Sequence, residues 1–217
     1  MKIRPFLLGA FVAICGPAVA SVDTVYSNPY DNSGNVNCSF STSCATQFNK
    51  GDDYAAQQFT LSKANVIVGA SFTDLEFGAG PSDVNWAFIR ADGAGGLPGT
   101  ILASGTDNFT SSSALGGGAV QNFFDVGTVA LDAGTYYLAF KADSSNIANY
   151  LGQGVQQSGA AETHDGGATW AAGYESQPSV AVAVFAVPEP ATWALMMIGF
   201  AGVGGALRRR SRSIAAA

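Results

Sequence analysis

The chain has 217 residues, of which 12% are charged and 27 are glycine, and its formal net charge is −6. Four basic and fifteen acidic residues lie between Ser21 and Val187, and an acidic body of this kind lacks the clustered cations that bind phosphate backbones. Nucleic-acid binding is therefore disfavoured, and the arginines near the C-terminus fit a membrane stop signal better than a nucleic-acid patch because they directly follow an apolar run. The apolar fraction of 47% argues against a disordered chain. Low charge with abundant glycine is typical of an extracellular all-β domain.

The first residues of the chain have the pattern of a secretory signal peptide. Lys2 and Arg4 form a positive start, residues 6–15 form a short apolar segment, and an Ala-Val-Ala sequence ends at Ala20. We therefore expect signal peptidase to cut after Ala20. Two alternatives stay open, namely an uncleaved anchor and lipoprotein processing at Cys15, which the preceding isoleucine disfavours.

Cys38 and Cys44 are the two cysteines that remain after signal cleavage. They lie close together in a stretch rich in serine and asparagine, and an exported chain meets an oxidising compartment. We therefore expect a disulfide between them. The alternative, a metal site, would need further ligands, and the chain has a single histidine. We expect neither a metal nor a cofactor.

Residues 21–186 are expected to form one extracellular all-β domain. Short apolar or alternating runs are separated by Gly, Asn and Asp, and none of them sustains a helical period. The apolar parity changes within 66–77, so we expect a bulge near Thr73, and the Ser- and Gly-rich stretch 110–118 is expected to be a flexible loop. Strands at this spacing predict an antiparallel β-sandwich that is jelly-roll-like. The expected strands are 57–61, 66–77, 84–88, 101–103, 122–126, 129–131, 135–140 and 180–185. In the third of these, Val84, Trp86 and Phe88 alternate with Asn85 and Ala87 and are expected on one face.

Candidate catalytic groups are few, and we expect a noncatalytic protein. His164 is the single histidine and no Gly-x-Ser-x-Gly sequence accompanies it, which disfavours a serine or cysteine hydrolase. A glycosidase would need two acids across a cleft, and strand alternation places Asp74 and Glu76 together on a solvent-facing side. Asp52 and Asp53 are a second acid pair. A calcium site in the loops stays open, with no ligand named.

Residues 163–170, with the sequence Thr-His-Asp-Gly-Gly-Ala-Thr-Trp, resemble the Asp-box, the hairpin turn repeated in sialidase propellers. In that family the aspartate caps turn amides and the tryptophan packs beneath, and Asp165 and Trp170 match those positions. A propeller needs one copy per blade, whereas this chain has one, so we expect a structural hairpin and no propeller. An alternative is a carbohydrate-binding surface whose exposed aromatic rings stack on sugars. Its candidate contacts are Trp86, Trp170 and Asp165, with Tyr150 and Tyr174 as further aromatics.

The C-terminal segment 187–217 combines a Pro-Glu-Pro sequence, an apolar span and a cluster of arginines. Residues 191–207 carry no charge and would extend about 26 Å as a helix, which is nearly the thickness of a bilayer core. The arginines follow at once and are expected to hold that end in the cytoplasm, with the domain outside. An ordinary membrane anchor is the alternative. The motif consists of Pro188, Glu189 and Pro190, and the stop signal of Arg208, Arg209, Arg210 and Arg212.

This tail resembles the PEP-CTERM sorting domain, in the variant in which Trp193-Ala194 follows the Pro-Glu-Pro spacer. The resemblance implies that the tail is a transmembrane substrate of an exosortase, a membrane-embedded processing enzyme. It also implies a Gram-negative host that exports the chain across its inner membrane to the cell surface or an extracellular matrix of exopolysaccharide. Residues 92–100 and 131–138 resemble a turn and a hairpin of secreted modules that precede such tails, which implies a structural or carbohydrate-binding module.

Three segments are therefore expected. They are a signal peptide at 1–20, an extracellular β-sandwich at 21–186 and a sorting tail at 187–217. Signal peptidase and an exosortase are the expected processing partners, and exopolysaccharide is a candidate partner of the mature domain.

Overall fold

The computed structural model describes residues 21–31, 53–75, 82–143, 150–151, 154–156, 158–173 and 179–187, together with residues 199 and 202. Several predictions lie outside the described residues, among them the signal peptide, the Cys38–Cys44 pair, the Pro188–Pro190 motif and the arginine cluster. Most of the apolar span 191–207 lies outside them too. Within the described part of the chain, no helix is long and apolar enough to cross a membrane.

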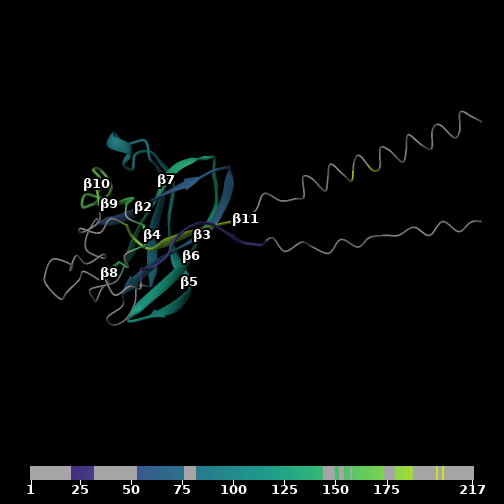
Figure 1. The fold of residues 1–217 in the computed structure, drawn as a ribbon. Helices are drawn as coiled ribbons and strands as arrows, with labels where there is room; N and C mark the ends of the chain where they lie inside the picture. Colours follow the sequence, from purple (N-terminus) through teal and green to yellow (C-terminus); the bar gives the residue numbers. More distant parts are fainter. Residues whose placement is uncertain are drawn as a thin grey trace, which may run out of the picture.

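The described residues form a curled antiparallel sheet of 11 strands (Figure 1). The order is β1-β11-β3-β6-β5-β4-β7-β2-β9-β10, and β8 pairs with β3. This confirms the predicted all-β, antiparallel fold. The strands are β1 (Asp23–Asn28), β2 (Tyr54–Leu61), β3 (Asn65–Leu75), β4 (Asp83–Arg90), β5 (Ile101–Gly116), β6 (Ala119–Leu131), β7 (Gly134–Asp143), β8 (Tyr150–Leu151), β9 (Ala160–Thr163), β10 (Ala171–Ala172) and β11 (Val182–Val187), with a short 3-10 turn, η1 (Ala94–Gly96).

Strand β5 joins the two halves of the sheet. Residues up to Asn108 pair with β4, whereas Phe109 and the residues after it pair with β6. We call the strands on one side, β1, β11, β3 and β6, the β3 half, and those on the other, β4, β7, β2, β9 and β10, the β4 half. The predicted loop at 110–118 is therefore wrong, because residues up to Gly116 belong to β5. Their polar side chains are exposed while their backbone pairs with β6, and composition does not reveal that pairing.

The main core lies between the two halves. Phe72 of the β3 half stacks on Phe140 of the β4 half, with 4.8 Å between ring centroids. Phe59 and Phe88 meet edge to face at 6.0 Å, and both are buried. The Phe72–Phe140 stack joins the two halves, whereas Phe59 and Phe88 both belong to the β4 half. Burial of these rings is the main apolar contribution that holds the curled sheet together.

A bulge in β3 sets which of its residues enter the core. The register with β6 shifts between Ile67 and Gly69, while the pairing around Thr73 is regular. The predicted bulge at Thr73 is therefore misplaced. The shift lets Ile67 and Ala70 both enter the main core, although their spacing would otherwise put them on opposite faces.

A second, smaller apolar cluster lies on the outer face of the β4 half. It consists mainly of alanines, Ala56, Ala87, Ala139 and Ala161, together with Ile89 and Tyr137. Because successive residues of a strand point to opposite faces, each alanine follows or precedes a residue that enters the main core. The outer face is therefore lined by short side chains.

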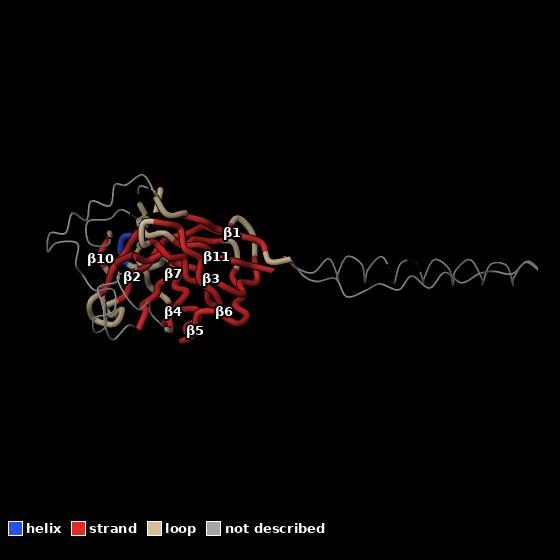
Figure 2. Tube along the Cα trace, turned by 90° about the horizontal axis from the view of Figure 1, so that it is seen from below, coloured by secondary structure: helices blue, strands red, loops and turns tan. Residues whose placement is uncertain are grey.

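The two ends of the sheet domain lie side by side. β1 and β11 are antiparallel neighbours, and Asp23 is paired with Ala186. Figures 1 and 2 show β1 and β11 at one end of the molecule and β10 at the other. The chain therefore enters and leaves the domain at the same edge.

Candidate functional site

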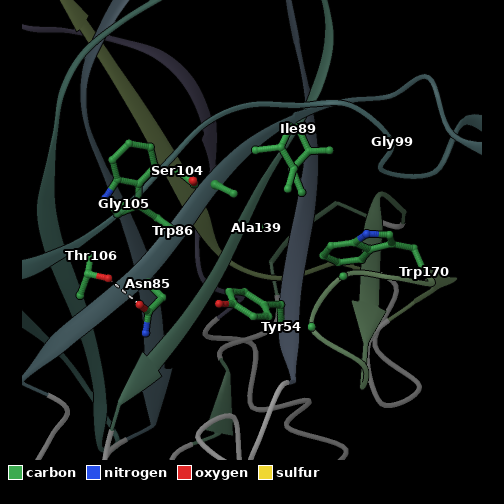
Figure 3. Close-up of a pocket in the computed structure, with 14 residues that line it drawn as sticks. Tyr54, Asn85, Trp86, Ile89, Gly99, Ser104, Gly105, Thr106, Ala139 and Trp170 are labelled. Atoms are coloured by element: carbon green, nitrogen blue, oxygen red, sulfur yellow. Dashed lines mark hydrogen bonds between the residues drawn. The ribbon is translucent and has the colours of Figure 1, made fainter.

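A pocket of about 320 Å³ opens on the outer face of the β4 half (Figure 3). Ala87, Ile89 and Ala139 of β4 and β7 line it from the sheet, and Tyr54 and Trp170 stand at its border. Because alanine side chains are short, the outer cluster leaves room here instead of filling it. The pocket brings Trp170, a predicted contact residue, together with residues from four strands.

The hairpin between β9 and β10 carries Trp170. Asp165 Oδ1 accepts a hydrogen bond from the Thr169 N–H at 2.9 Å, and its Oδ2 accepts one from Thr169 Oγ1 at 2.6 Å. Thr163 Oγ1 donates to Asp165 Oδ1 at 2.7 Å and accepts from the Gly167 N–H at 3.0 Å. The predicted capping of turn amides by Asp165 is therefore confirmed. A contact between Asp165 and a glycan stays a prediction.

The charge on Asp165 is stabilised by the same bonds. Hydrogen bonds lower the pKa of the Asp165 carboxyl from 3.8 to about 2. In order of decreasing effect, they come from the side chain of Thr169, its backbone N–H and the side chain of Thr163. The carboxylate is therefore ionised at neutral pH and is held as a turn cap. Trp170 directly follows Thr169 and packs against the outer alanine cluster, so this turn fixes the position of the indole.

A second turn, residues 91–100, reaches the pocket through Gly99. Asp92 Oδ1 accepts from the Thr100 N–H at 2.7 Å, and Oδ2 accepts from Thr100 Oγ1 at 2.8 Å. These two hydrogen bonds lower the pKa of Asp92, and the one from the Thr100 backbone N–H has the larger effect. A Cβ on Gly99 would lie 2.6 Å from the Gly93 nitrogen, so the turn requires glycine at this position. Two turns with the same aspartate–threonine bonding thus border the pocket.

The polar groups at the pocket are hydroxyls, an amide, two indole N–H groups and backbone. Asn85 Oδ1 accepts a hydrogen bond from Thr106 Oγ1 at 2.6 Å, and Ser104 lies beside them on β5. No Asp, Glu, Lys or Arg is among the described residues that line the pocket. Lys141 lies near one border, with its Nζ 5.8 Å from the centroid of the Tyr54 ring. The pocket itself therefore presents neutral hydrogen-bonding groups beside aromatic and aliphatic carbon.

Trp86 reaches the pocket lining, but the prediction that it is exposed is wrong. Its side chain is 7% exposed and belongs to the main core, where its ring lies 5.8 Å from that of Phe88. Alternation explains this, because Val84, Trp86 and Phe88 were expected on one face and that face is the inner one. The large indole leans over Gly105 of β5, where a Cβ would lie 2.9 Å from its Cζ2 atom. Trp86 is therefore a core residue and not a stacking platform.

His164 lies on the β9–β10 hairpin and is 56% exposed. Its Nδ1 lies 3.1 Å from Asp53 Oδ1, and its Nε2 lies 3.9 Å from Glu162 Oε1. The two acids face opposite nitrogens of one ring, so the three groups do not converge on one ion. Accordingly, no group of three or more His, Cys, Asp or Glu in the described part of the chain is arranged to hold a metal.

The burial of Asp74 differs from what the sequence predicted. Alternation placed it on a solvent face, but it is fully buried and accepts a hydrogen bond from Asn122 Nδ2 at 2.9 Å. Asn122 in turn accepts from Ser112 of β5. Glu76 and Asp52, the other members of the two acid pairs, lie outside the described residues. Asp74 therefore joins three neighbouring strands within the sheet instead of facing solvent.

Sequence reasoning missed Tyr54, Asn85 and Thr106 as pocket residues. Asn85 had a usable signal, because a polar residue between Val84 and Trp86 must point away from the core. Tyr54 precedes the strand that was predicted from 57 onward, and Thr106 falls in a part of β5 that was not predicted. Of the other aromatic candidates, the side chain of Tyr150 and all of Tyr174 lie outside the described parts.

Comparison with known proteins bears on the tail. A family model of the PEP-CTERM protein-sorting motif matches residues 186–210. No curated protein matches the chain. The match begins within β11, one residue before the strand ends at Val187.

Proposed function

Since the chain carries a PEP-CTERM sorting motif, we propose that it is a noncatalytic surface or extracellular-matrix protein that an exosortase cleaves near Pro188–Pro190. The motif implies processing by an exosortase and export to the cell envelope or surface. The finer proposal is that a signal peptidase first removes residues 1–20. The apolar span and arginines then hold the tail in the inner membrane of a Gram-negative cell, and cleavage releases the domain into an exopolysaccharide matrix.

The position of the motif supports this order of events. β11 ends at Val187, so Pro188 follows the last strand without a spacer. Each proline lacks a backbone N–H and disfavours the α conformation of the residue before it, which favours an extended segment for a processing enzyme. Because β1 starts beside the end of β11, both proposed cleavage sites lie at one edge of the domain.

The proposal that the protein is noncatalytic rests on the chemistry of the pocket. Its lining offers hydroxyls, one amide and aromatic rings, none of which is a strong acid or base near neutral pH. The exposed His164 has acids at both nitrogens, whereas a hydrolase needs a nucleophile at one of them.

A jelly-roll-like sandwich is the proposed fold assignment. Along the chain, β1, β3 and β6 belong to one half, and β2, β4 and β7 to the other. The last long strand, β11, returns between β1 and β3. This alternation between facing halves, with the first and last strands adjacent, supports a double Greek-key winding.

The mass of the mature C-terminus tests the sorting proposal. We expect a chain that ends near residues 188–190 in wild-type cells and an uncleaved tail in exosortase-deleted cells. Replacing Glu189 and both prolines should block cleavage but leave insertion intact, because the apolar span and arginines remain. Finding the intact tail through Ala217 in both strains would contradict sorting and leave an ordinary membrane anchor.

A carbohydrate-binding module is the second candidate function. It is favoured by one observation, the pocket bordered by Tyr54 and Trp170. Sorting and carbohydrate binding are compatible, since they involve opposite ends of the molecule.

A further inference from the structure

The pocket occupies a position suited to contact with material outside the cell. It is built on the β4 half beside the β9–β10 hairpin, which Figure 1 shows at the end of the molecule away from the outer ends of β1 and β11. A chain held at its C-terminus would therefore present this end away from its point of attachment.

The size of the pocket fits a small ligand. Its volume of about 320 Å³ is at the lower end of the range of about 300–1,000 Å³ that is usual for ligand pockets. The short side chains of Ala87 and Ala139 line it and leave this space open. Tyr54 and Trp170 border it (Figure 3). A terminal or branching unit of a polymer fits such a space better than a long continuous segment.

The chemistry of the lining selects the class of ligand. A pyranose ring has apolar C–H faces that pack on aromatic rings, and hydroxyls that exchange hydrogen bonds with amides and hydroxyls. Trp170 offers a half-buried indole, and the Asn85–Thr106 pair offers neutral polar atoms. No charged side chain is among the described residues that line the pocket, so an acidic or phosphorylated ligand finds no ionic partner within that lining, and Lys141 lies only near one border.

We propose that this pocket binds a neutral saccharide unit, with Trp170 as the stacking residue and Asn85 and Thr106 as hydrogen-bonding residues. The inference rests on the carbohydrate-binding candidate and is independent of sorting. Two contacts of the sequence prediction are dropped: Trp86 is a core residue, and Asp165 is engaged within its turn. The residues proposed in their place are Tyr54, Asn85 and Thr106.

The hairpin gives Trp170 a fixed position before any ligand arrives. Asp165 ties Thr169, the neighbour of Trp170, through both the backbone and the side chain. The indole also packs against the outer alanine cluster. A ring held in place loses little conformational freedom on binding, which favours affinity for a small ligand.

Titration with defined oligosaccharides tests the proposal. The full chain, in a detergent without a sugar headgroup, is titrated by calorimetry with cellotetraose, maltotetraose, mannotetraose, galactotetraose and, as an acidic probe, tetragalacturonate. We expect at least one neutral tetrasaccharide to bind. Trp170→Ala should weaken that binding about tenfold or more, and Trp170→Phe should retain most of it, because a ring remains.

Matched variants separate binding from folding. Phe123→Ala removes a half-buried ring from the outer face of the β3 half, and it should change affinity by less than about twofold. Thr106→Val should weaken binding, whereas Thr128→Val, an exposed threonine outside the pocket, should not. Thermal unfolding of each variant shows whether the domain is intact.

Three results would overturn the proposal: no probe binds at all, only the acidic probe binds, or a neutral probe binds equally well to folded Trp170→Ala. None of these results bears on sorting. Cleavage of the tail is read from the C-terminal mass, so failure of one proposal is distinguishable from failure of the other.

Discussion

The two faces of the β4 half differ in the size of the side chains that they carry. On the inner face, Phe88 and Phe140 are fully buried and meet rings from elsewhere in the main core. On the outer face, the neighbouring residues Ala87 and Ala139 are also mostly buried, but they border a pocket. The same strands thus provide stability through large residues on one face, and they leave a pocket beside small residues on the other.

Removing a ring from the inner face should have the largest effect. Phe88→Ala is expected to lower the free energy of unfolding by about 3–5 kcal/mol, because it leaves a cavity among packed rings. Phe123→Ala, at a half-buried site on an outer face, should lower the free energy of unfolding clearly less. Denaturant unfolding of both variants measures the difference, and equal losses would contradict the contrast between the faces.

Adding one methyl group to the inner face should have the next largest effect. In Gly105→Ala the new Cβ would lie 2.9 Å from Trp86 Cζ2 and 3.1 Å from its Cε2. A buried indole has little room to move, so the loss of stability should be about 1–3 kcal/mol. Ser104→Ala, at the exposed neighbouring position, is the control and should stay within about 0.5 kcal/mol of wild type.

Enlarging the outer face should affect binding more than stability. Ala87→Leu projects into the pocket, so we expect the free energy of unfolding to change by less than about 1 kcal/mol while binding of the neutral tetrasaccharide is lost. Ala130→Leu, an exposed alanine of β6, is the matched control and should bind normally. Normal binding by Ala87→Leu would show that the ligand lies elsewhere.

Acidification should give the smallest effect, confined to the hairpin that carries Trp170. The pKa of Asp165 is about 2 in the folded chain and near its ordinary value of 3.8 in the unfolded chain. Its contribution to stability is therefore present above the unfolded value and is lost as the pH falls through about 2. The difference in Tm between wild type and Asp165→Ala should shrink between about pH 4 and pH 2. A difference that stays constant over this range would contradict the turn-cap role of the ionised carboxylate.

The sequence predicted features that depend on local pattern. Alternation placed Val84, Trp86 and Phe88 on one face, and the Asp-box resemblance identified the turn cap at Asp165. The polar Asn85 between Val84 and Trp86 indicated that Trp86 points inward. The prediction of an exposed Trp86 gave more weight to the ability of an indole to stack on sugars than to this alternation. Whether Asp74 is buried depends on the partner strand that carries Asn122, and this pairing is not encoded nearby in the sequence.

The pocket could not be predicted because it depends on long-range pairing. Tyr54 and Trp170 are brought together when β2 pairs with β9, which places Tyr54 opposite Thr163. Asn85 and Thr106 become neighbours only through the register of β4 and β5. Local propensity contains no signal for either contact, and the exposed polar side chains of β5 resembled those of a loop.

The pairing of β11 has a mechanical consequence. This strand lies between β1 and β3 and is hydrogen-bonded to both along its length. Interstrand hydrogen bonds run perpendicular to the strands, so a pull on the chain beyond Val187 acts along β11 and shears both ladders at once. Breaking them together needs a larger force than opening them one by one. A domain attached through its C-terminus would therefore resist drag from flowing water or from a shared matrix without a covalent crosslink at that end.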